Sequence, residues 1–215
     1  MKCFAPWHSI LVRFNGDIVP DGVYLKRYGN VLETPLNDLL NSNTASYTRD
    51  SIRSGVLPPE CEQCALKEAS VGHSRRKFFE DILNPMLIGK DYDYSKNFTD
   101  IYFLEFNMSN ICNLKCRMCD GINSSAWVKD DLKLAKNGNP YFRRINDPEF
   151  GYTNKSEQII EKLFEDPTPF MNLRYLSIKG GEPYMEPANK IILKKFIDLG
   201  IAKNVTLDWT TNGTI

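Results

Sequence analysis

The sequence predicts an α/β protein with about three βα units in residues 101–215, preceded by a small α+β domain in residues 1–90. Three segments read as strands, at about 101–107, 173–178 and 204–209. Helix-like segments lie within 122–136 and 187–199, so strands alternate with helices. This alternation is typical of parallel sheets.

The three strands rest on different signals. The first, at about 101–107, is bulky and rich in aromatic residues, and the second, at 173–178, is mainly apolar. In the third, Val205, Leu207 and Trp209 alternate with polar residues. Ser156 is expected to cap an inserted amphipathic helix, and Glu186 followed by Pro187 predicts the start of another.

The first 90 residues carry a hairpin signal and two helix signals. Residues 10–14 and 17–19 flank Asn15-Gly16, a favoured hairpin turn. Thr34 before Pro35 predicts an N-cap and first helical residue, and a second helix is expected over 44–54. The polar, tyrosine-rich residues 91–100 read as a linker.

The most informative motif is a loop after the first predicted strand that holds Cys112, Cys116 and Cys119. A structural zinc ion takes four protein ligands, as does an iron–sulfur cube held entirely by protein. Three thiolates can instead hold three irons of a [4Fe–4S] cluster and leave the fourth open. A zinc knuckle that borrows a ligand from elsewhere and plain buried thiols are the alternatives.

This C-x3-C-x2-C spacing resembles the signature of radical S-adenosylmethionine (SAM) enzymes. The resemblance implies that the amino and carboxylate groups of SAM chelate the open iron. One electron then splits a C–S bond of SAM and releases a 5′-deoxyadenosyl radical. It also implies that Met118 lies beside the SAM adenine. Asn110 is a candidate to position the loop.

Two later motifs extend the resemblance. The segment Gly180-Gly181-Glu182-Pro183 is similar to the family's GGEP motif, which contacts the SAM amino group, although it also fits an ordinary strand-to-helix turn. Asn212 belongs to a T-N-G segment like the one that ends the family's third strand near the cofactor. Asn-Gly alone more often marks a hairpin turn.

Cys3 followed by Pro6-Trp7, the Asn15-Gly16 turn and the later C-x2-C of Cys61 and Cys64 together resemble a twitch domain, the shortened form of the SPASM domain. That resemblance implies an auxiliary iron–sulfur cluster held by Cys3, Cys61 and Cys64, with Asp21 where the family has a fourth thiol. A carboxylate is a harder ligand and binds iron less tightly. A zinc site, or a fold that has lost its cluster, are the alternatives. In most members this domain follows the barrel rather than preceding it.

A radical SAM core is generally a partial (βα)6 barrel, and residues 101–215 supply about half of one. We therefore expect a fragment of a longer protein or one piece of a split enzyme, which is incomplete as an enzyme by itself. The balance of 27 basic and 27 acidic residues gives no clear nucleic-acid signal. No apolar run approaches a membrane span and no signal peptide is evident, so a cytoplasmic location is expected, with the cysteines reduced.

Other polar and aromatic side chains are expected to have structural roles. His8 and His73 are predicted to be exposed or hydrogen-bonded rather than metal ligands, and Trp7 and Trp127 to pack. Residues 75–77, Arg-Arg-Lys, are predicted to form a solvated face.

The sequence thus predicts a radical SAM enzyme that binds a [4Fe–4S] cluster and SAM, with peptide or protein modification as the implied reaction class. Its expected partners are SAM, a substrate that is a peptide by this analogy, and an electron donor. The rival prediction is a non-catalytic iron–sulfur or zinc module for electron transfer or structure. Gly180, Gly181 and Glu182 discriminate between the two, because an electron carrier needs no site for the SAM ammonium group.

Overall fold

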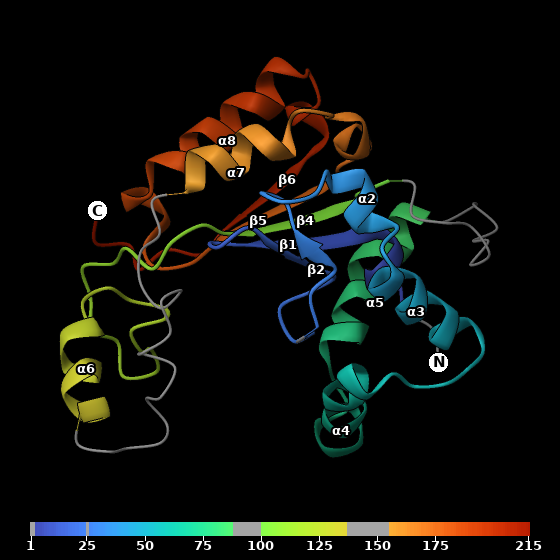
Figure 1. The fold of residues 1–215 in the computed structure, drawn as a ribbon, viewed down its shortest axis with the longest axis horizontal. Coiled ribbons are helices and arrows are strands. Elements are labelled where there is room, and N and C mark those ends of the chain that lie inside the picture. The colour runs from blue at the N-terminus through green and yellow to red at the C-terminus, as the bar shows by residue number, and fades with distance from the viewer. Residues whose placement is uncertain (1–2, 25, 88–99, 137–154) are drawn as a thin grey trace.

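A computed structural model describes residues 3–24, 26–87, 100–136 and 155–215. Its centre is a six-stranded mixed sheet with the order β3-β2-β1-β4-β5-β6 (Figure 1). The predicted linker 91–100 lies outside the described residues except for Asp100. The strands are β1 Ser9–Arg13, β2 Asp17–Val19, β3 Gly29–Asn30, β4 Phe103–Asn107, β5 Tyr175–Lys179 and β6 Thr206–Trp209.

The sheet joins the N-terminal segment to the later βα units. Strands β1 and β2 form the antiparallel hairpin predicted at Asn15-Gly16, where Gly16 has a φ of 89°. Strand β1 then pairs in parallel with β4, with Ile10 opposite Leu104 and Val12 opposite Phe106. Strands β4, β5 and β6 are parallel to one another. Strand β1 lies on the β4 side of these three strands, and β6 is one edge of the described sheet.

The helices lie on both faces of the sheet (Figure 1). Helices α7 and α8 cover one face, and α5 packs against the other. The helices are α1 Ala5–His8, α2 Leu36–Leu40, α3 Asn43–Arg53, α4 Glu62–Val71, α5 Arg75–Leu87, α6 Val128–Lys136, α7 Ser156–Leu163 and α8 Pro187–Asp198.

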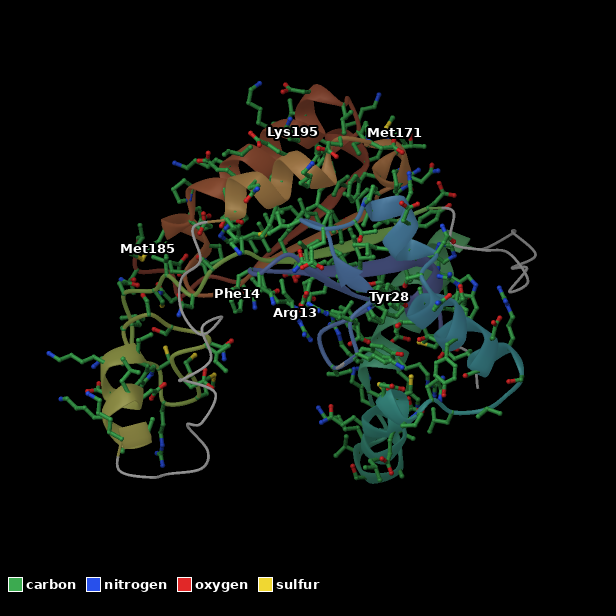
Figure 2. All side chains as sticks on the ribbon, viewed as in Figure 1. Arg13, Phe14, Tyr28, Met171, Met185 and Lys195 are labelled. Atoms are coloured by element: carbon green, nitrogen blue, oxygen red, sulfur yellow. The ribbon has the colours of Figure 1, made fainter. Side chains whose placement is uncertain are left out.

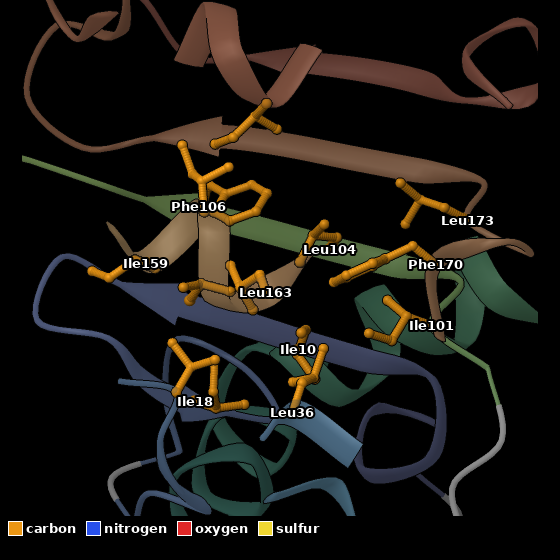
Figure 3. Packing of buried hydrophobic residues seen from close by; sticks show 14 of the residues in the cluster. Ile10, Ile18, Leu36, Ile101, Leu104, Phe106, Ile159, Leu163, Phe170 and Leu173 are labelled. Carbon is orange, nitrogen blue, oxygen red and sulfur yellow. The ribbon is translucent and has the colours of Figure 1, made fainter. Parts of the chain in front are cut away.

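Side chains on the two faces of β4 contribute to two separate hydrophobic cores. Leu104 and Phe106 belong to the larger core, where they lie near Leu163 of α7 (Figure 3). Phe103 points to the opposite face and packs in a second core with Phe79 of α5. Its ring also stacks on Tyr175 of the neighbouring strand, with 4.9 Å between ring centroids. Successive strand residues face opposite sides of a sheet, so one short strand contributes to both layers.

The expected strands and the helices α3, α6 and α8 form close to their predicted positions. Two predicted caps are wrong. Pro35, not Thr34, precedes α2 and makes no side-chain cap. Ser156 is the first residue of α7, and its hydroxyl donates to the Met108 carbonyl oxygen instead of capping the helix. Helices α4 and α5 were not predicted.

The histidines and tryptophans match their predicted roles in part. His8 is buried and its Nδ1 lies 3.1 Å from the Asp100 carbonyl oxygen, whereas His73 is exposed. Trp7 is buried, and the indole Nε1 of Trp127 donates to the Cys116 carbonyl oxygen. No helix in the described part of the chain is long and apolar enough to cross a membrane.

Candidate functional site

The three motifs singled out in the sequence meet at the carboxyl ends of β4, β5 and β6. The backbone N–H of Gly181 donates to the Ser109 carbonyl oxygen at 2.9 Å, and that of Glu182 donates to Ile111 at 2.6 Å. These bonds fasten the GGEP loop to the start of the cysteine loop. Met185, just beyond this motif, lies on the same side of the molecule as α6 (Figures 1 and 2).

Glycine is required where these loops touch. A Cβ atom on Gly181 would lie 2.1 Å from the Ile111 carbonyl oxygen, far inside van der Waals contact. Gly180 has a φ of 126°, which L side chains rarely adopt, and its Cβ would lie 2.6 Å from the Ser109 carbonyl oxygen. The two glycines therefore permit backbone contact between adjacent strand ends.

Glu182 connects the second motif to the third. Its side chain is 1% exposed, and Oε2 accepts the backbone N–H of Asn212 at 2.8 Å. Oε1 accepts the hydroxyl of Thr211 at 2.9 Å and the N–H of Tyr184 at 3.2 Å. A carboxylate offers about four lone-pair positions, so one remains for a further donor such as an ammonium group.

The T-N-G loop also contacts the cysteine loop. The Asn212 amide Nδ2 donates to the Cys112 sulfur at 3.7 Å and to Asn113 Oδ1 at 3.0 Å. Asn113 in turn donates to the Thr214 hydroxyl at 2.8 Å. Asn212 is thus placed by both neighbouring motifs.

Side chains within the cysteine loop hold its backbone in place. The Nδ2 of buried Asn110 donates to the Gly121 carbonyl oxygen at 2.6 Å, in agreement with its predicted positioning role. The Ser124 hydroxyl donates to the Leu114 carbonyl oxygen at 2.6 Å. These two bonds fix the path of the loop backbone between the cysteines.

The three thiols lie near one another but not as a finished ligand set. Cys116 is exposed, Cys112 and Cys119 are partly exposed, and Met118 is 93% exposed. Burial, and then the neighbouring Cys116 and Cys112 thiolates, raise the pKa of the Cys119 thiol. Among the described residues, no three His, Cys, Asp or Glu side chains are arranged to hold a metal ion. The donor types nevertheless fit an iron–sulfur cluster, which thiolates bind.

A second group of thiols lies around one cavity in the N-terminal segment. The four ligands expected from the sequence all line it, namely Cys3, Asp21, Cys61 and Cys64. Burial is the main cause that raises the pKa of Cys3 strongly and that of Cys61 to about 12, and neighbouring negative groups add to both effects. Burial also raises the pKa of Asp21. A cationic metal centre would stabilise the ionised form of all four groups.

An ion-paired cluster on the sheet connects this cavity to the motif loops. Glu105 on β4 is 6% exposed and accepts from Arg75 Nη2 at 2.8 Å and from Lys179 Nζ at 2.9 Å. Lys179 directly precedes Gly180, and the Arg75 charge acts on Asp21. The prediction of a solvated face at 75–77 is wrong for Arg75 and Arg76, whose side chains are only 19% and 16% exposed. A lone glutamate in an apolar strand was the signal that sequence reasoning missed.

Comparison with known proteins found one family that is similar to the N-terminal segment. Residues 3–65 match the SPASM family, described as an iron–sulfur cluster-binding domain, and the four expected ligands in the cavity fall inside the match. SPASM domains are associated with radical SAM proteins. No curated protein and no solved structure matches the chain. Residues 3–65 are therefore similar to a SPASM iron–sulfur cluster-binding domain, and the fold that contains them is mixed α/β.

Proposed function

We propose that this protein is a radical SAM enzyme that binds a [4Fe–4S] cluster and SAM where its three motif loops meet. The observation that carries the proposal is that Glu182, in the GGEP loop, is hydrogen-bonded to both other motif loops. Its carboxylate accepts from the T-N-G loop, and its backbone N–H donates to the cysteine loop. The SPASM match at residues 3–65 also supports the proposal, because SPASM domains are associated with radical SAM proteins.

Each motif residue has a role in this proposal. Cys112, Cys116 and Cys119 would hold the cluster, which supplies the electron for reductive cleavage of SAM. The free lone pair of Glu182 would accept the SAM ammonium group. Because Gly180 and Gly181 have no side chains, the GGEP loop can contact the cysteine loop. Pro183 would fix the end of the GGEP loop, since its carbonyl oxygen accepts a hydrogen bond from Asn189 of α8 at 3.0 Å. Asn212 would orient the loop beside Cys112, and exposed Met118 would contact the adenine.

The N-terminal cavity would hold the auxiliary cluster of a twitch-like domain, with Asp21 as a weaker fourth ligand. Peptide or protein modification is the reaction class we propose, with a peptide substrate and a separate electron donor as partners. All six cysteines are free, which supports a reducing compartment such as the cytoplasm.

A non-catalytic iron–sulfur or zinc module is the second candidate. It is favoured by the burial of Glu182, which is 1% exposed and already accepts three hydrogen bonds from the protein. An electron carrier or structural module would leave SAM intact. The two candidates therefore differ in one measurable product.

The deciding experiment supplies anaerobically reconstituted protein with dithionite and SAM and measures 5′-deoxyadenosine. We expect slow product formation from the wild type, because residues 101–215 supply about half of a barrel, and at least about a tenfold loss in Glu182→Gln, which cannot bind an ammonium group as a carboxylate does. Glu157→Gln, at an exposed position on α7, is the matched control and should keep the wild-type rate. Metal-loaded wild type that yields no product would support the non-catalytic module instead.

A further inference from the structure

A pocket of about 550 Å³ lies between α4 and the start of α5, next to the cysteine cavity, with which it shares Val23 and Cys64. One face of α4 forms one wall, through positions 63, 64, 67, 70 and 71. Ser74, Arg75 and Phe78 form the other. Its size is typical of a small-molecule site.

The lining of this pocket is basic and apolar. Three of its ten lining residues are Lys67, His73 and Arg75, and none is acidic. Val23, Val71 and Phe78 supply apolar surface, and the 73% exposure of Val71 leaves it available for contact. Such a pocket is suited to a ligand that joins an anionic group, which the basic side chains would bind, to an apolar group, which would pack against the apolar walls.

Arg75 is held in place before any ligand arrives. Its guanidinium lies 4.5 Å from the Phe78 ring centroid and 4.9 Å from that of Phe79. Among the described residues its one hydrogen bond is from Nη2 to Glu105, so its remaining N–H donors are available. Glu105 is shared with Lys179, and one carboxylate therefore offsets two cations. Arg75, Lys179 and Glu105 together carry a net positive charge, and Asp21 is the acidic group that acts on Arg75 from the neighbouring cavity.

Lys67 supplies the adaptable part of the site. It is exposed on α4 and lines the pocket one helical turn after buried Cys64. An exposed lysine can move its ammonium group toward an anion, whereas the fixed, forked guanidinium of Arg75 suits the two oxygens of a carboxylate. Together they favour a carboxylate over a neutral group of the same shape.

We infer that this pocket binds a carboxylate carried on an apolar or aromatic group, as found in a free aromatic acid or at the C-terminus of a peptide. The inference does not depend on a bound cluster, because the pocket is formed by protein side chains. It can therefore fail or hold independently of the radical SAM proposal.

Calorimetry on the metal-free full chain tests the inference with N-acetyl-L-phenylalanine and its uncharged amide. The acid should bind at least about tenfold more tightly than the amide. The tripeptide Gly-Gly-Phe, as acid and as amide, distinguishes the two sources: tighter binding of the peptide acid assigns a peptide C-terminus, and equal or weaker binding assigns a free acid.

Two charge-reversal variants test the location. Lys67→Glu should weaken acid binding at least about tenfold, whereas Lys77→Glu, on α5 outside the pocket lining, should change it less than about twofold. Bound acid should also protect Lys67 from reductive methylation. Equal affinity for acid and amide, no binding of either, or an unchanged affinity in Lys67→Glu would overturn the inference.

Discussion

At the scale of single residues, the contact between the motif loops depends on a missing side chain. Gly181 donates its N–H to Ser109, and the Ile111 carbonyl oxygen occupies the place of a Cβ atom. The obstacle is backbone rather than a flexible side chain, so it cannot turn away. The geometry of the three-motif site is therefore sensitive to one methyl group.

Gly181→Ala should destabilise the protein by about 3 kcal/mol, at the upper end of the usual cost of overpacking, because the two loops must separate. Urea unfolding monitored by tryptophan fluorescence measures the change. Gly22→Ala is the control, since its Cβ would meet Glu105 Oε1 at an ordinary 3.7 Å. Equal midpoints for the two variants would contradict the close approach described here.

A second residue-scale feature is the pairing of Glu68 with Arg76. Hydrogen bonds from Arg76, and then from Ser74, hold the pKa of Glu68 below its ordinary value. Because the folded-state pKa lies below that of the unfolded chain, ionised Glu68 stabilises the fold above the unfolded pKa. This stabilisation is lost as the pH falls through the folded pKa.

The stability difference between wild type and Glu68→Gln should therefore be largest near pH 7 and should shrink toward about pH 3. Urea titrations at a series of pH values measure it. Glu157→Gln should match the wild type throughout. A difference that stays constant with pH would show that the Glu68 charge does not contribute.

At the scale of elements, local patterns predicted the parts whose signal lies within a few residues. Asn15-Gly16 identified the hairpin, and the alternation around Leu207 identified β6. Helix α5 was missed although Phe79 and Leu83 have helical spacing, because its basic start was read as a solvated face. The cap predicted at Ser156 failed because Lys155 holds the N-cap position and Ser156 is already the first helical residue, and its hydroxyl donates to the Met108 carbonyl oxygen.

The sequence predicted the parts of the candidate site that have a local motif, and it missed the contacts between distant residues. The cysteines, glycines and Glu182 stand in recognisable order along the chain, so their grouping could be expected from parallel strands. The hydrogen bonds that Glu182 accepts from Thr211 and Asn212 join residues about thirty positions apart and have no local signal in the sequence. Glu105 was missed because its partners, Arg75 and Lys179, come from two separate elements.

Glu105 connects α5, β4 and β5, and we expect Glu105→Gln to cost about 3 kcal/mol because it leaves two partly buried cations without their shared carboxylate. Asp198→Asn, which breaks the exposed pair with Lys194 on α8, should cost less than about 0.5 kcal/mol. Chemical denaturation of both variants measures the difference. Similar small losses would show that the Glu105 cluster is not a structural connection.

At the scale of the whole molecule, the parallel pairing of β1 with β4 makes one sheet from segments about ninety residues apart. No local pattern specifies this contact. It brings the SPASM segment and the motif loops onto the same sheet, with both cores built on β4. The two halves of the chain are therefore expected to unfold together.

Native-state hydrogen exchange checks this expectation. Amides of β1 and β4 should exchange with the same free energy of opening and the same dependence on denaturant, since each strand is paired with the other in the sheet. Amides of the edge strand β6 should exchange faster. Opening of β1 at a much lower free energy than β4 would contradict a shared cooperative unit.

The most direct test of the central claim uses the variant in which Cys3, Cys61 and Cys64 are serine, so that iron can be assigned to the cysteine loop. After anaerobic reconstitution and reduction, its EPR spectrum is recorded with and without SAM. We predict a [4Fe–4S] signal that SAM perturbs and that disappears when Cys116→Ala is added. A spectrum that SAM leaves unchanged, or zinc in place of iron, would contradict a cluster with an open iron at this site.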